Sequence, residues 1–219
     1  MHIPDGFLAT KVWAPLWIVA AGGLWYCIRR VSAELQDRAV PLMGVMAAFI
    51  FAAQMLNFPV AGGTSGHLLG GVLAAALLGP WAGAVVISIV LVAQCLLFQD
   101  GGITALGANI VNMAIIGSGL SYAIYALTRS APGIRAMRRP DPIIVAVAVA
   151  SWCSVVLASA ACAFELALSG TSPLRIALPA MVAVHALIGI GEAVITCLVV
   201  SSVLKVRPDL VYGVAGGQS

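Results

Sequence analysis

The stretch WAGAVVISIVLVAQCLLF, residues 81–98, contains no charged residue. Its eighteen residues fall within the length that a helix needs to cross the hydrocarbon core of a bilayer, about 17 to 25 residues. A continuous apolar run of this length predicts a transmembrane helix. The rest of the chain decides whether this helix is an isolated anchor or one of several.

Apolar segments of the same character recur along the whole chain, at residues 14–28, 40–58, 68–78, 81–98, 103–127, 143–168 and 178–204. Hydrophobic residues make up 62% of the chain and charged residues 9%, against about 45–50% and about 25% in soluble domains. We therefore expect one all-α membrane domain over residues 1–219, with about seven transmembrane helices. Segment 68–78 is too short to cross about 30 Å of hydrocarbon at 1.5 Å per residue, so we expect the rest of the protein to shield it.

The positive charges predict the orientation in the membrane. With the N-terminus outside and the C-terminus inside, only Lys11 and Arg175 lie outside. Nine basic residues then lie inside, as the positive-inside rule requires: Arg29, Arg30, Arg38, Arg129, Arg135, Arg138, Arg139, Lys205 and Arg207. The distribution of basic residues thus indicates how the chain is oriented in a lipid bilayer. We therefore expect no nucleic-acid partner. Because Arg29 and Arg30 follow the first apolar segment, that segment is not expected to be a cleaved signal peptide.

The N-terminal sequence MHIPDG, residues 1–6, has the chemistry of a chelator. If nothing precedes Met1, its α-amine, the backbone nitrogen of His2 and a ring nitrogen of His2 can close fused chelate rings around one metal ion. Histidine is bulky, so we expect the initiator methionine to be retained. Pro4 stiffens the backbone, and Asp5 with Gly6 predicts a turn that folds the tip back toward the helices.

A fourth nitrogen is expected from His67, which follows a glycine-rich stretch and precedes the short apolar segment. Tetragonal nitrogen coordination favours Ni²⁺ or Cu²⁺, allows Co²⁺, and does not suit Mg²⁺ or Ca²⁺, which prefer oxygen. Two simpler interpretations stay open. His2 can be a solvated terminal residue, and His67 can bind a carbonyl group of its own loop.

Other polar residues are expected near this site or along an ion path: Asp5, Ser65, Asn109, His185 and Glu192. Asp5 and Asn109 are the better candidates for holding a ligating imidazole, since they lie in the terminal tip and in a neighbouring loop. His185 and Glu192 are seven residues apart and share one helical face. They either line an ion path or form hydrogen bonds between helices, and the second interpretation is favoured.

Several motifs resemble the substrate-binding component of energy-coupling factor transporters for cobalt and nickel, the CbiM/NikM family. They are MHIPDGFL at 1–8, GGTSGHLLGG at 62–71, QDGGITALGANIVNMA at 99–114, FELAL at 164–168 and PAMVAVHALIGIGEAVIT at 179–196. The resemblance implies a seven-helix protein of a prokaryotic cytoplasmic (inner) membrane, with its N-terminal tip inserted into the bundle. It also implies a roughly planar site made of the Met1 amine, the backbone and ring nitrogens of His2, and His67.

The same resemblance implies uptake of Ni²⁺ or Co²⁺ as the substrate, with no prosthetic group and no enzymatic activity. Pro4 and Asp5 look more like nickel members of the family. The implied partners are a transmembrane coupling protein, a pair of cytoplasmic ATPases and often a small accessory membrane protein. The chain itself has no Walker GK[ST] sequence, because its two lysines follow Thr10 and Leu204.

Two other functions remain open on the sequence. Residues 63–66, GTSG, match the GxSG pattern of intramembrane serine proteases, with Ser65 as nucleophile and His185 as base. This interpretation leaves MHIPDG unexplained. Alternatively, the chain binds metal at the outer face as a sensor and transports nothing.

Overall fold

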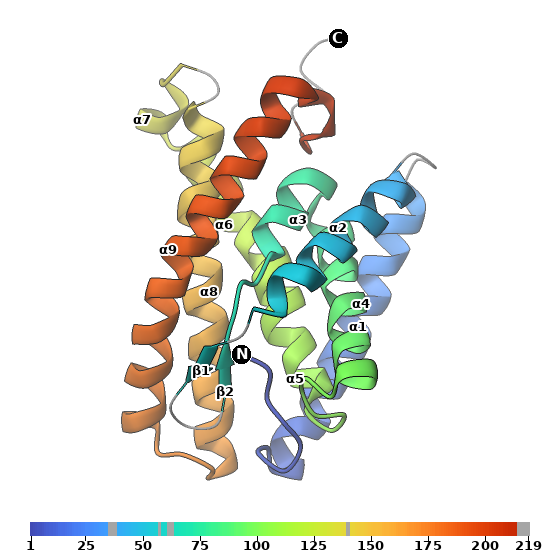
Figure 1. The fold of residues 1–219 in the computed structure, drawn as a ribbon, viewed down its shortest axis with the longest axis vertical. Coiled ribbons are helices and arrows are strands. Elements are labelled where there is room, and N and C mark those ends of the chain that lie inside the picture. The colour runs from blue at the N-terminus through green and yellow to red at the C-terminus, as the bar shows by residue number, and fades with distance from the viewer. Residues whose placement is uncertain (35–38, 57, 61–63, 139–140, 214–219) are drawn as a thin grey trace.

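The structure is a computed structural model that describes residues 1–34, 39–56, 58–60, 64–138 and 141–213. Figure 1 shows that helices dominate the described chain, which confirms the predicted helical class. The helices are α1 (Thr10–Glu34), α2 (Ala39–Gln54), α3 (Gly71–Leu78), α4 (Pro80–Phe98), α5 (Leu106–Ile110), the π-helix η1 (Val111–Leu120), α6 (Ser121–Ser130), α7 (Pro132–Arg135), α8 (Asp141–Ser169), α9 (Leu174–Val206) and the 3₁₀-helix η2 (Pro208–Leu210). A short antiparallel hairpin, β1 (Phe58–Val60) and β2 (Thr64–Gly66), joins α2 to the segment before α3.

In the described part of the chain, five helical stretches are long and apolar enough to cross a membrane: Thr10–Ala33, Pro80–Phe98, Leu106–Ser130, Pro142–Ser169 and Leu174–Val206. Two of the seven expected segments are shorter helices in the structure. The segment at 40–58 gives helix only to Gln54. The segment at 68–78 becomes helical only at Gly71, after Gly70 takes a left-handed conformation with φ 74°. The chain is therefore a multi-pass membrane protein with five candidate spans and two short apolar helices.

The short helix α3 is enclosed by its neighbours, as expected. Its residues from Gly71 to Leu77 are all buried, and the helix packs against α4, η1, α8 and α9. A Cβ added at Gly71 would lie 2.5 Å from the carbonyl oxygen of Gly117 in η1, so this crossing requires glycine. The enclosure holds the start of α3, and the loop before it, at a fixed place inside the protein.

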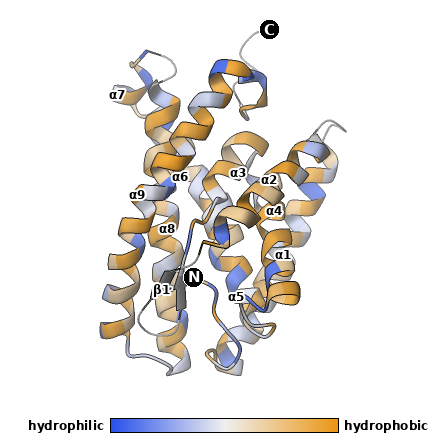
Figure 2. Cartoon of the chain, viewed as in Figure 1, coloured by the Kyte–Doolittle hydropathy of each residue, from blue (hydrophilic) through white to orange (hydrophobic). Residues whose placement is uncertain are grey.

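The longer helices surround this interior. Helices α8 and α9 pack along each other, and α1 and α4 form another contacting pair; Figure 1 shows these two pairs on opposite sides of the molecule. Figure 2 shows that α1, α4, α8 and α9 are mostly hydrophobic along their lengths. Large side chains such as Ile18, Leu168, Leu187 and Leu198 are exposed there, each by more than 60%. An apolar exterior of this kind suits a lipid surrounding.

The two ends of the described chain lie in different environments. In Figure 1 the N-terminus lies in the middle of the molecule beside the β1–β2 hairpin, whereas the last described residues, which follow η2, lie at the end occupied by α7 and the last turns of α9. The first residues therefore pass into the protein instead of extending from it. The structure thereby brings the predicted chelating tip next to the segment that contains His67.

Candidate metal site

The first three residues are anchored inside the protein. Met1 and Ile3 are 0% exposed and His2 is 4% exposed. The backbone N–H of Ile3 donates to Oδ1 of Asn109 at 2.9 Å, and Nδ2 of Asn109 donates to the Ile3 carbonyl at 3.2 Å. The N–H of Gly102 donates to the same carbonyl at 2.9 Å. Burial of a side chain such as Ile3 contributes about 1.5–3 kcal/mol, so apolar contact and backbone pairing both hold the tip.

Asp5 fixes the turn that leads into this tip. Its carboxylate accepts hydrogen bonds from the N–H groups of Ile103 and Thr104, at 3.1 and 2.8 Å, and from the Thr104 hydroxyl. The hydroxyl bond is the largest influence that lowers the pKa of Asp5 from its ordinary 3.8. Asp5 therefore joins the N-terminal segment to the 103–104 backbone. Its hydrogen bonds go to this loop, not to an imidazole as the sequence suggested.

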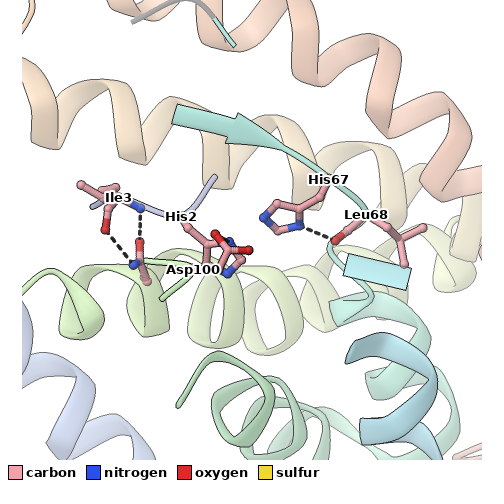
Figure 3. A network of polar contacts seen from close by, with 6 residues as sticks. His2, Ile3, His67, Leu68 and Asp100 are labelled. Atoms are coloured by element: carbon pink, nitrogen blue, oxygen red, sulfur yellow. Dashed lines mark hydrogen bonds and ion pairs between the residues drawn. The ribbon is translucent and has the colours of Figure 1, made fainter. Parts of the chain in front are cut away.

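The rings of His2 and His67 face each other. Their centroids are 4.6 Å apart and their planes differ by 19°, and both side chains are buried, His67 at 1% exposure. Figure 3 shows His67 approaching from the chain after β2, while His2 comes from the N-terminal segment. The structure thus brings together two of the three histidines of the chain, from positions 65 apart in the sequence.

The ring nitrogens have different partners. Nδ1 of His67 lies 2.7 Å from the carbonyl oxygen of Leu68 and therefore carries the proton of this bond, which leaves Nε2 as the nitrogen with a lone pair. Within the described chain, this Nε2 has no hydrogen-bond partner. The predicted loop-carbonyl bond and the predicted ligand role of His67 are thus compatible, since they use different nitrogens.

Nδ1 of His2 lies 3.1 Å from Oδ1 of Asp100 (Figure 3). Nδ1 is also the ring nitrogen that can close a chelate ring with the backbone nitrogen of the same residue. An ion held by this chelate would therefore meet the carboxylate of Asp100 next to the ring. The contact places a negative charge at the edge of the site, where the side chain of Asp100 is 20% exposed.

The environment of this cluster favours the neutral forms of the Met1 amine and of the rings of His2 and His67. Burial lowers the pKa of the Met1 amine from 8.0 to about 5. Burial is also the largest cause that lowers the pKa of His2 and places that of His67 well below 6.5. For both rings, a positive charge on the Met1 amine acts in the same direction. Burial therefore favours the neutral forms of these groups, in which a nitrogen keeps the lone pair that metal coordination requires.

Side chains alone do not complete this site. Over the described residues, no group of three or more His, Cys, Asp or Glu side chains is placed so that it could hold a metal ion. The predicted donor set therefore also needs two nitrogens that are not in side chains, the amine of Met1 and the backbone nitrogen of His2.

The remaining predicted residues lie outside the immediate cluster. Nδ1 of His185 lies 2.8 Å from the Met181 carbonyl in its own helix, and its Nε2 has no hydrogen-bond partner in the described part of the chain. Glu192 binds backbone N–H groups just before α3. The prediction of a hydrogen bond between helices is therefore wrong for His185. The hydrogen bonds of Glu192 join α9 to the loop before α3. Ser65 pairs with Pro59 in the hairpin, and its side chain lies outside the described residues.

Sequence reasoning missed two residues beside His2. Asp100 lies within the motif at 99–114, and Gln94 lies within the apolar segment at 81–98. Gln94 is fully buried and close enough to raise the pKa of His2 slightly. The signal for Asp100 was its charge, because acidic residues are few in this chain. Nothing in the sequence paired it with position 2.

Comparison with known proteins assigns the chain to a class of membrane transport proteins. Residues 2–210 match the family model described as "Cobalt uptake substrate-specific transmembrane region", CbiM. The chain therefore belongs to the CbiM family, as its motifs suggested.

Relatives and solved structures agree with this assignment. The chain is 42% identical over 213 residues to the putative fused nickel transport protein NikMN of Archaeoglobus fulgidus, covering 96% of this chain and 68% of that protein. It is 32% identical over 221 residues to the cobalt transport protein CbiM of Thermosediminibacter oceani, covering 97% and 87%. A crystal structure of a truncated transition metal transporter superposes with a TM-score of 0.85 at 36% identity, covering 94% of this chain and 99% of that one.

The class of function follows from these names. The relatives are metal transport proteins, not enzymes. The serine-protease alternative gains no support from these names, since they describe transport proteins. Metal transport, with nickel or cobalt as the ion, is the function that the family defines.

Proposed function

We propose that this protein binds one Ni²⁺ or Co²⁺ ion through the amine of Met1, the backbone and Nδ1 nitrogens of His2, and Nε2 of His67. The observation that carries the proposal is the buried N-terminus, which brings the His2 ring to 4.6 Å from the His67 ring. Four nitrogen donors favour a late transition metal over Mg²⁺ or Ca²⁺. The proposal requires Met1 to be the first residue of the mature protein.

We propose further that the bound ion is the substrate of an energy-coupling factor transporter, in which this chain is the substrate-binding component. Its partners are a membrane coupling protein and a pair of cytoplasmic ATPases, often with a small accessory membrane protein. The absence of a GK[ST] sequence from the 219 residues supports an external source of energy. Co-purification of an ATPase with the tagged chain from its native membrane tests the partnership, and purification without any ATPase contradicts it.

The proposed orientation has the N-terminus outside and the C-terminus inside the cytoplasmic membrane. An odd number of spans, five by length and composition, supports opposite sides for the two ends. The basic residues of α6, α7 and the end of α9 lie at the C-terminal end of the molecule in Figure 1, which agrees with the positive-inside rule. A membrane-impermeant thiol reagent applied to intact cells should label Ser172→Cys in the α8–α9 connection and spare Gly133→Cys in α7. The reverse pattern contradicts the orientation.

The binding site itself is tested by inserting four alanines between Met1 and His2. The insertion keeps every side chain but places the terminal amine too far from His2 for the fused chelate to form, whether or not Met1 is removed. Purified protein is incubated with Ni²⁺ and Co²⁺ together, freed of loose metal and analysed for both elements, while intact mass confirms the N-terminal residue. We expect about one ion per chain in the native protein and none in the variant.

Two controls make this result interpretable. His67→Ala should weaken binding and still retain the three-nitrogen chelate, whereas an alanine inserted in the α6–α7 connection should leave binding unchanged. Equal loading of the native protein and the terminal insertion would overturn the proposed ligand set. The element that the native protein retains identifies its preferred substrate.

A further inference from the structure

Glu192 is buried in α9 and directs its carboxylate at the backbone just before α3. The N–H of Leu69 donates to Oε2 at 2.7 Å, and the N–H of Gly70 donates to Oε1, also at 2.7 Å. Both oxygens are used, and the side chain is 1% exposed. A buried carboxylate is costly unless such donors compensate for lost hydration, so this contact is a specific feature of the fold.

The segment that receives these hydrogen bonds begins with His67. Nδ1 of His67 is bonded to the Leu68 carbonyl at 2.7 Å. The next carbonyl, that of Leu69, accepts a hydrogen bond from Nε2 of Gln54 in α2 at 2.8 Å. Residues 67–70 are therefore held from α2 on one side and from α9 on the other. Glu192 supplies two of these bonds with a single side chain.

The orientation of His67 depends on this backbone. Its Nδ1 bond to Leu68 is a contact between neighbouring residues, so it fixes the ring relative to the chain but not to the rest of the protein. The hydrogen bonds that Leu69 and Gly70 donate to Glu192 fix this segment relative to α9. Gly70 also has a positive φ of 74°, a conformation that glycine adopts without strain.

We propose that Glu192 is a positioning residue for the metal site: by holding the N–H groups of Leu69 and Gly70, it directs Nε2 of His67 toward the N-terminal chelate. This inference rests on the ligand role of His67 proposed above. Glu192 does not touch the ion. It acts through two backbone hydrogen bonds, as the residues that orient metal ligands commonly do.

The chain offers a matched control in Glu165. This residue is also a buried glutamate of a long helix, at 7% exposure in α8. Its Oε2 accepts a hydrogen bond from the side chain of Asn112 at 2.8 Å, and no bond joins it to the backbone of residues 67–70 in the described structure. Glu165→Gln thus repeats the loss of a buried carboxylate without disturbing the His67 segment.

The test compares Glu192→Gln and Glu165→Gln in the full-length protein with Ni²⁺ alone. The glutamine amide presents an NH₂ group to one of the two N–H donors, so the double contact is lost. We expect Glu192→Gln to weaken Ni²⁺ binding about 10–100-fold, the range seen when such outer residues are lost, and to shift the visible absorption of the bound Ni²⁺ toward that of His67→Ala. Glu165→Gln should change neither. An unchanged affinity and spectrum in Glu192→Gln would overturn the proposal.

A double-mutant cycle separates positioning from general structural damage. In the His67→Ala background, Glu192→Gln should have no further effect on affinity, because its route to the ion is already absent. An equal loss in both backgrounds would overturn the positioning role. If Glu192→Gln does not accumulate in the membrane, Glu192→Asp keeps both acceptor oxygens, and its partial spectral shift serves the same comparison. Failure of the ligand set itself is recognised separately, since the terminal alanine insertion would then bind Ni²⁺ normally.

Discussion

The side chain of Asn109 exchanges two hydrogen bonds with the backbone of Ile3, at 2.9 and 3.2 Å, as a paired strand would. Asn109 is 1% exposed and lies in α5. The amide thus satisfies both backbone groups of the residue next to His2, deep within the protein. The N-terminal segment has no regular secondary structure of its own, so this side chain substitutes for it.

Replacing Asn109 should therefore release the tip. Asn109→Leu leaves the N–H and carbonyl of Ile3 without this partner, and we expect Ni²⁺ affinity to fall about tenfold or more. Asn109→Asp keeps an acceptor for the Ile3 N–H and should lose less. Isothermal titration of the purified proteins with Ni²⁺ gives the comparison. Equal affinities for native protein and Asn109→Leu would show that the tip is held well enough by its apolar contacts.

Asp100 should act on the approach of the ion. Its carboxylate lies 3.1 Å from Nδ1 of His2 and is partly exposed, so it attracts a divalent cation toward the buried nitrogens. We expect Asp100→Asn to slow Ni²⁺ association several-fold at low ionic strength, with a smaller effect at high salt, as stopped-flow measurement would show.

Asp209 provides the control for charge. It is an exposed acid after α9, paired with Arg207 at 2.7 Å, and Asp209→Asn removes the same charge far from the site. Slowing of the same size in both variants would mean that the total charge of the protein matters, and not the place of Asp100.

Gly102 leaves the space into which the N-terminal segment fits. A Cβ at this position would lie 2.2 Å from the backbone nitrogen of Asp5 and 2.7 Å from its Cα. We expect Gly102→Ala to displace the segment and to abolish Ni²⁺ binding while the protein still inserts into the membrane. Gly119→Ala in η1 is the matched control, because no atom lies within 4 Å of its added Cβ. Normal metal loading of Gly102→Ala, measured by elemental analysis, would contradict this steric account.

The turn at Asp5 predicts a dependence on acid. The pKa of this carboxyl is lower in the docked structure than its ordinary 3.8, chiefly because of the Thr104 hydroxyl. A lowered pKa means that the stabilisation is fully present above the ordinary value and is lost as the pH falls through the docked value. We expect Asp5→Asn to have a lower melting temperature than the native protein at pH 6, and this difference to begin shrinking only as the pH falls below about 4. A difference that grows with acidity would have the wrong sign.

The sequence predicted the helical membrane class because the apolar runs in the chain are long enough to predict membrane helices without other evidence. It also predicted that the N-terminal tip folds back toward the helices and lies beside His67, since unusual donors at one end of an apolar chain stand out; the ligand roles of His2 and His67 stay predictions. The boundaries of α3 were harder to predict from the sequence. The segment 68–78 is apolar throughout, and the left-handed Gly70 that delays the helix depends on contacts with α2 and α9.

The hydrogen bonds around the site were beyond sequence reasoning for a related reason. Asp5 pairs with Thr104, Asn109 with Ile3, and Glu192 with Leu69, at separations of 99, 106 and 123 residues. No local pattern specifies such pairs, because they are fixed only when the helices are packed. Polar residues in apolar helices signalled that partners were needed, but not which backbone groups would provide them.

Met1, His2 and Ile3 are at most 4% exposed, so the segment that would coordinate the ion also closes over it. An ion held there would leave when these three residues withdraw from the interior, a local opening of the kind that gates many binding sites. The slowest step of exchange is then the same for every ion that the site accepts. An ion with a strong ligand field and an ion with a weak one would have the same maximum rate of release.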